Sequence, residues 1–248
     1  MTDEPRIISD KNLRGTRITA SDLSGVIARG VVIGGAEIDS PWLLEGGATL
    51  VVNGVDVVPF VDAELDRRFP GRALRTAEDP DGLRAAWAAL EQTWAETVAR
   101  VAAMPAGTVD ESVEGEWSFA QTLRHLIMAT DMWLGRAVLG RQDAFHPIGL
   151  LDDGTAADGG DIIPTLSEPP TYDEVLQIRA ERMAMVRDFL AATTADELAE
   201  QRPNPHAPQH AESVLSCVRT ILEEEWEHHR YAVRDLDTLT GRAAKNPA

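Results

Sequence analysis

The chain has 248 residues, a formal net charge of −18 and a single cysteine, Cys217. Its hydrophobic fraction of 44% and charged fraction of 26% are typical of a globular protein, and this length accommodates one large domain or two smaller ones. The negative charge repels nucleic-acid phosphates and anionic lipids, and one cysteine excludes an internal disulfide. No apolar run reaches the length of a membrane span, and the first residues do not resemble a secretion signal. We therefore expect a cytoplasmic protein that binds neither nucleic acid nor membrane.

The first part of the chain, residues 1–60, contains a period of five. An aliphatic or small residue occupies every fifth position from Leu13 to Leu43, and motifs such as Asp22-Leu23-Ser24-Gly25 surround these positions. The pattern resembles pentapeptide repeats, which form a square β-solenoid with the central apolar side chains pointing inward. Such repeats bury a core only by stacking on neighbours, and here there are enough for fewer than two coils. The alternative is a small irregular β region with coincidental spacing.

Residues 49–58 predict a β-hairpin, because two β-branched runs are joined by Asn53-Gly54. Residues 61–78 are expected to form a short helix, ended by Pro70-Gly71, and a linker. We expect the N-terminal part to be a structural or docking region, because it contains no histidine and no carboxylate cluster.

Residues 79–248 predict a helical domain. Apolar residues follow helical spacing in four long segments, and Ser118 with Gln121 and Thr171 with Glu174 form capping boxes. We therefore expect a mainly α fold, a four-helix bundle preceded by the small β region. The expected long helices begin near Asp79, Ser118, Thr171 and Ser213, with a long crossover over residues 141–170.

The fourth predicted helix contains the run Glu223 to His229, in which carboxylates precede imidazoles by four residues. Residues four apart lie on one helix face, so Glu224 with His228, or Glu225 with His229, could bind one cation through oxygen and nitrogen. His125, inside the second predicted helix, is the candidate third ligand.

The segment from Gly115 to Leu126, containing Trp117-Ser118-Phe119 and His125, resembles the second-helix signature of the DinB/YfiT-like superfamily. The resemblance covers roughly the last two-thirds of the chain. In that family one histidine of the second helix and two ligands four apart on the fourth helix hold a divalent metal, usually with three histidines. The resemblance implies His125, Glu224 and His228 as ligands of zinc, nickel or iron.

Helical periodicity favours the other register. Glu225 and His229 project onto the centre of the apolar stripe of the fourth helix, whereas Glu224 and His228 project onto its edge. Both registers remain open at this point. A glutamate in place of a histidine would lower the net charge of the site and make a bound metal a weaker Lewis acid.

The resemblance implies a metal-dependent transferase that joins a low-molecular-weight thiol, such as mycothiol, to an electrophile. One alternative is a non-catalytic scaffold or protein-interaction module with a degenerate metal site, and another is a metal-assisted hydrolase. A homodimer is also expected, since bundles of this type often pair through exposed apolar helices. Three tryptophans are candidates for a cofactor pocket, although such residues more often pack in a core: Trp117, Trp133 and Trp226.

Overall fold

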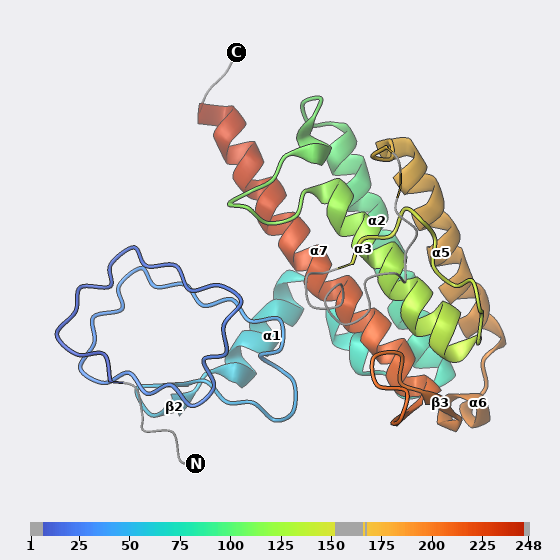
Figure 1. Ribbon diagram of the computed structural model, residues 1–248, viewed down its shortest axis with the longest axis horizontal. Helices are drawn as coiled ribbons and strands as arrows, with labels where there is room; N and C mark the ends of the chain where they lie inside the picture. The colour runs from blue at the N-terminus through green and yellow to red at the C-terminus, as the bar shows by residue number, and fades with distance from the viewer. Residues whose placement is uncertain (1–6, 152–165, 167, 246–248) are drawn as a thin grey trace. The chain divides into compact units, whose positions relative to one another are not determined.

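The computed structural model describes residues 7–151, 166 and 168–245 (Figure 1). The chain divides between Ser40 and Pro41 into two compact units. Among the described residues, no helix is both long and apolar enough to cross a membrane.

Residues 7–40 of the first unit wind in an open coil without helix or strand (Figure 1). Backbone hydrogen bonds close turns such as that from the Leu13 carbonyl to the Thr16 amide, at 3.0 Å. The central side chains remain exposed, with 54% of Leu13 and 61% of Ile18 accessible. The five-residue spacing of the sequence thus recurs in the backbone, while an enclosed solenoid stays a prediction. Positive φ angles occur at every fifth residue, namely Asp10, Gly15, Ala20, Gly25, Gly30 and Gly35.

The second unit begins with the predicted hairpin, formed by β1 (Val51–Val52) and β2 (Val55–Asp56) in antiparallel register. Asn53 and Gly54 have φ angles of 51° and 85°, as a two-residue hairpin turn requires. Helix α1 (Val58–Arg68) and the 3₁₀ helix η1 (Arg72–Thr76) follow. The predicted short helix is therefore present. Ion pairs join the two elements, from Arg72 and Arg75 to Asp62 and Asp66.

In the described part of the second unit, four long helices make up most of the chain, and they begin where their N-cap residues predict. Asp79 accepts hydrogen bonds from two backbone amides of the first turn, and Ser118 and Thr171 each form the complete capping box with the residue three positions later. The helices are α2 (Pro80–Ala102), α3 (Phe119–Thr130), α5 (Tyr172–Ala192) and α7 (Val214–Lys245).

Shorter elements connect the long helices. The second predicted helix continues beyond α3 as a π-helix, η3 (Asp131–Val138), which sequence periodicity did not predict. A second hairpin, which the sequence did not predict, precedes the last long helix. The remaining elements are η2 (Thr108–Asp110), α6 (Ala195–Ala199), β3 (Gln201–Pro203) and β4 (Ala211–Ser213).

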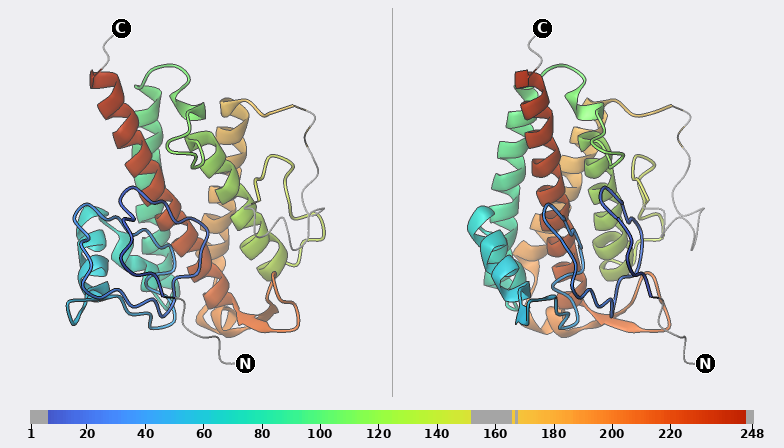
Figure 2. Two further views of the ribbon diagram at one scale, coloured as in Figure 1. Left: turned by 60° about the vertical axis from the view of Figure 1, so that its left-hand side comes forward. Right: turned by 90° about the vertical axis from the view of Figure 1, so that its left-hand side faces the viewer.

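The long helices pack pairwise around one core, with α2 and α3 each contacting both α5 and α7. Figure 2 shows them side by side. The described residues are mainly helical, as the sequence predicts, and they also form two short hairpins, of which the sequence predicted the first. Fully buried apolar side chains from all of these helices fill the core, among them Leu83, Trp87, Leu90, Leu123, Leu126, Ile127, Leu190, Ile221, Leu222 and Trp226.

Candidate metal centre

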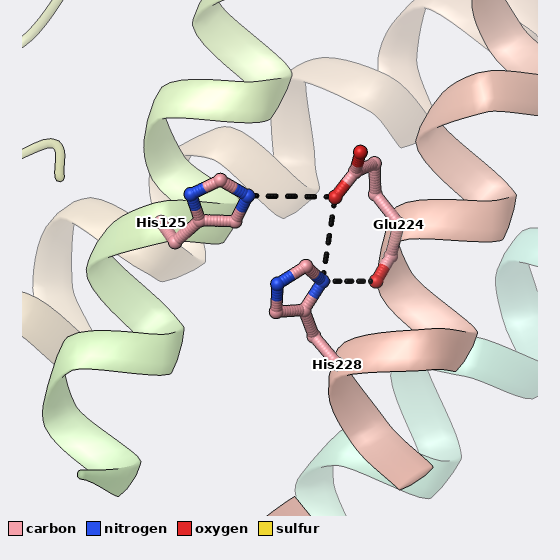
Figure 3. Close-up of side chains that lie close together, drawn as sticks. All are labelled: His125, Glu224 and His228. Atoms are coloured by element: carbon pink, nitrogen blue, oxygen red, sulfur yellow. Dashed lines mark hydrogen bonds and ion pairs between the residues drawn. The ribbon is translucent and has the colours of Figure 1, made fainter. Parts of the chain in front are cut away.

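Helix α7 carries Glu224 and His228 one turn apart. The helix begins where the Ser213 hydroxyl accepts a hydrogen bond from the Ser216 amide, at 3.0 Å. Side chains four residues apart lie above one another on a helix, and Figure 3 shows both pointing toward α3. Two potential ligands therefore come from one rigid element.

His125 comes from α3 and faces this pair (Figure 3). Its Nε2 lies 3.4 Å from Oε2 of Glu224, and Nδ1 of His228 lies 3.3 Å from the same oxygen. One potential ligand atom from each of the three residues lies within 4.8 Å of the others. His125, Glu224 and His228, which we call the triad, therefore bring two imidazoles and one carboxylate to one point between α3 and α7.

The ring of His125 is held by the segment that follows η3. Its Nδ1 lies 3.2 Å from the carbonyl oxygen of Leu150. That segment is fixed to α3 by Arg124, whose Nε donates to the Ile148 carbonyl at 2.8 Å and whose carbonyl accepts from the Leu150 amide at 3.2 Å. A carbonyl can only accept, so Nδ1 of His125 carries a proton, and Nε2, which faces Glu224, is the ring atom that can bind a metal. Ligand histidines of metal proteins are oriented by the same kind of hydrogen bond.

His228 has the corresponding arrangement within its own helix. Its Nδ1 lies 2.9 Å from the backbone carbonyl oxygen of Glu224, which assigns the proton to Nδ1 and a lone pair to Nε2. Burial, followed by the neighbouring His125 imidazole, lowers the pKa of His228 to about 4. At neutral pH this imidazole is uncharged, which is the form that binds a metal.

Nε2 of His125 and the Glu224 carboxylate face each other at 3.4 Å, an arrangement that a cation between them would make favourable. Further negative charge lies nearby. Burial and the charge of Glu224 raise the pKa of Glu45, and burial and the charge of Glu45 raise the pKa of Glu223. The Glu224 side chain is 33% exposed, whereas His125 is buried. Glu224 therefore provides the side from which solvent reaches the triad.

Trp117 lies against both triad histidines. Its ring centroid is 4.7 Å from that of His125 and 6.0 Å from that of His228, and it is nearly parallel to the latter. A cavity of about 10 Å³ adjoins Trp117 between Phe119 and Leu236, which is room for about one water molecule. No triad residue lines that cavity, and Trp117 contacts the triad through its ring.

Residues 89–232, more than half of the chain, match the model of the DinB superfamily. The chain belongs to this superfamily. The matched region contains all three triad residues and extends from α2 to the middle of α7. No curated protein and no solved structure matches the chain.

The second pair of candidates, Glu225 and His229, lies on another side of α7 in this DinB-superfamily protein. Arg179 of α5 donates to both carboxylate oxygens of Glu225, at 2.6 Å to Oε1. His229 lies with its Nε2 2.8 Å from the hydroxyl of Thr97 in α2. Only 1% of Glu225 and 4% of His229 is exposed. The structure thus places this pair in polar contacts of the core and the other pair in the triad.

The three candidate tryptophans are separated in the structure. Of these three tryptophans, only Trp117 has a described ring contact with the triad histidines. Trp226 is buried in the core, with its ring 6.0 Å from that of His229. Trp133 packs against His206 of the loop between β3 and β4.

Two features of the DinB-superfamily site had no signal in the sequence. The Leu150 carbonyl is a backbone group, which any residue supplies, and its position depends on the fold of the segment after η3. Glu45 is distant in sequence from α7 and belongs to no motif. Arg179, by contrast, did give a signal. It lies on the apolar side of its predicted helix, and a buried arginine requires a carboxylate partner.

Proposed function

We propose that this chain is a metal protein of the DinB type, a four-helix bundle that binds a divalent cation through His125, Glu224 and His228. The observation that supports it best is the convergence of the three ligand groups within 4.8 Å. Two imidazoles and one carboxylate form a donor set that zinc, nickel and iron accept. Three protein ligands leave at least one coordination position open, as in catalytic rather than structural zinc sites.

We propose further that the site activates a low-molecular-weight thiol, such as mycothiol, for transfer to an electrophile. A bound cation would lower the pKa of a coordinated thiol. His125 and His228 would hold the cation with rings fixed by the Leu150 and Glu224 carbonyls. Glu224 would offset part of the charge, and its exposed side would be the approach for the thiol.

Metal analysis tests the first part of the proposal. The purified protein should bind one equivalent of zinc, nickel or iron, and alanine at His125 or His228 should reduce the bound metal by at least roughly tenfold. His210→Ala is the matched control, because His210 is exposed and lies in the loop between β3 and β4. Unchanged metal content in the triad variants would refute the site.

Substrate assays test the second part. The metal-loaded protein is incubated with mycothiol and a panel of electrophiles, and thioether products are followed by mass spectrometry. Conjugates that depend on His125 support transfer. Products containing water in place of the thiol would instead support metal-assisted hydrolysis with the same ligands, and no product with a full metal site would favour the non-catalytic scaffold.

A further inference from the structure

The first unit exposes many large apolar side chains. Val32 is 95% exposed, Ile27 is 73% exposed and Ile38 is 69% exposed. Monomeric soluble proteins rarely present contiguous apolar surface of more than a few hundred Å². Other large apolar residues of the same segment are at least half exposed, namely Leu13, Ile18, Leu23, Val26, Val31 and Ile33. We therefore expect the exposed apolar side chains of residues 7–40 to be covered by another protein surface.

The shape of this segment restricts what can cover it. Positive φ angles recur every five residues from Asp10 to Gly35, so the backbone turns at regular intervals and presents short faces of equal length. Units of this kind bury their apolar side chains by stacking on a neighbour of the same shape, and a terminal unit that stays in solvent normally has a polar outer face. Here many of the exposed side chains are apolar, and a second copy of the segment has the matching period.

Charge also favours a second copy. The chain has a net charge of −18, so most of its surface repels another copy. Within residues 7–40, four acidic and four basic residues give a net charge of 4 − 4 = 0. Two copies of this segment can therefore approach without net repulsion, and their opposite charges can pair. The charged residues are Asp10, Asp22, Glu37 and Asp39, with Lys11, Arg14, Arg17 and Arg29.

We propose that residues 7–40 form the interface of a homodimer, in which two copies of the segment stack on each other about a two-fold axis. Such an interface is self-complementary, because each copy contributes the same surface. A stable interface uses about 20–30 residues from each partner, which a segment of this length provides. The dimer is independent of the triad and of the proposed chemistry.

Sedimentation of the full chain at increasing concentration tests the proposal. The wild-type chain should be a dimer, and Ile18→Glu and Val32→Glu should each weaken the dimer by roughly 30-fold or more, because each puts a charge into the apolar interface. Phe60→Glu is the matched control. Phe60 is also a large exposed apolar residue, 68% accessible, but it lies on α1. A monomeric wild type, or a dimer that survives both substitutions in residues 7–40, would overturn the proposal.

Amide hydrogen exchange distinguishes packing of residues 7–40 on a second copy from packing on the helical unit of the same chain. In the dimer, protection of residues 7–40 should increase with protein concentration and disappear in Val32→Glu. Protection that is equal in a monomer and at every concentration would mean that the segment packs on its own chain, and the proposal would fail. Circular dichroism checks that the helices remain folded in each variant, since the substitutions lie outside the second unit.

Discussion

Neighbouring glutamates of α7 have opposite surroundings, and this makes them a matched pair for mutation. The Glu224 side chain is one-third exposed and contacts His125 and His228. Glu225 is buried and pairs with Arg179. Glu224→Gln should reduce divalent-metal affinity by roughly 10–100-fold with little change in the free energy of unfolding. Glu225→Gln should lower that free energy by about 3–5 kcal/mol, because it leaves Arg179 buried without its charge partner.

Isothermal titration with zinc and urea unfolding of the metal-free proteins measure the two effects separately. Equal losses of metal affinity in both variants, with equal free energies of unfolding, would contradict the assignment of Glu224 to the metal site and of Glu225 to the core ion pair. This contrast also explains why periodicity favoured Glu225 and His229. Projection onto a helix face predicts burial, and both residues are indeed buried, but burial does not distinguish a core ion pair from a metal ligand.

His229 should make stability depend on pH. Burial lowers its pKa from 6.5 to about 4. Because the folded value lies below the unfolded one, the unfolded chain binds the proton first as the pH falls. The free energy of unfolding is therefore unaffected by His229 above about pH 6.5, and it should decrease by roughly 3 kcal/mol as the pH falls to 4.

Urea unfolding in the presence of a chelator, at pH values from 7 to 4, measures this loss. The difference between wild type and His229→Gln isolates the contribution of His229 from that of His228 and the carboxylates. His210→Gln is the control, because His210 is exposed. If the difference in free energy of unfolding between wild type and His229→Gln does not change with pH, the lowered pKa of His229 is contradicted.

At the scale of elements, η3 and the segment after it position His125. Asp131 opens η3 and is buried, with its carboxylate accepting from Nε of Arg182 at 2.5 Å and from the His146 amide at 2.8 Å. Asp131 thus fixes the start of the segment whose Leu150 carbonyl orients His125. Asp131→Ala should speed amide exchange at His146 and Leu150 and reduce metal affinity about tenfold.

Exposed Asp143 lies in the same segment, so Asp143→Ala is the matched control and should leave exchange and affinity unchanged. Faster exchange without any change in metal affinity would mean that the Leu150 contact does not orient the ligand.

The sequence predicts elements well where local hydrogen bonds determine them. Asp79, Ser118 and Thr171 mark helix starts because their side chains cap amides two or three residues away, and Asn53-Gly54 fixes a hairpin through its backbone angles. The π-helical turn of η3 is different. Asp131 at its start contacts His146 and Arg182, which are distant in the chain, and no local pattern predicts these contacts or the π-helical turn. The same holds for the Leu150 carbonyl and for the partner of Glu225.

At the scale of the whole molecule, a metal at the triad would link α3 to α7, two helices that are far apart in the chain. Such a link exists only in the folded state. Bound metal at about 100 times its dissociation constant should stabilise the fold by about 2.7 kcal/mol. For a protein of this size that corresponds to a rise in melting temperature of about 5–11 °C.

Thermal unfolding with zinc and with magnesium measures this link. Zinc should raise the melting temperature of the wild-type chain, and the rise should be lost in His125→Ala and Glu224→Gln, whose melting transitions in chelator serve as references. Magnesium at the same concentration should have little effect, because it prefers six oxygen ligands and the triad offers two nitrogens. A rise with zinc that is equal in wild type and triad variants would place the metal elsewhere on this acidic chain. In that case a cation that bridges α3 and α7 would not contribute to the stability of the fold.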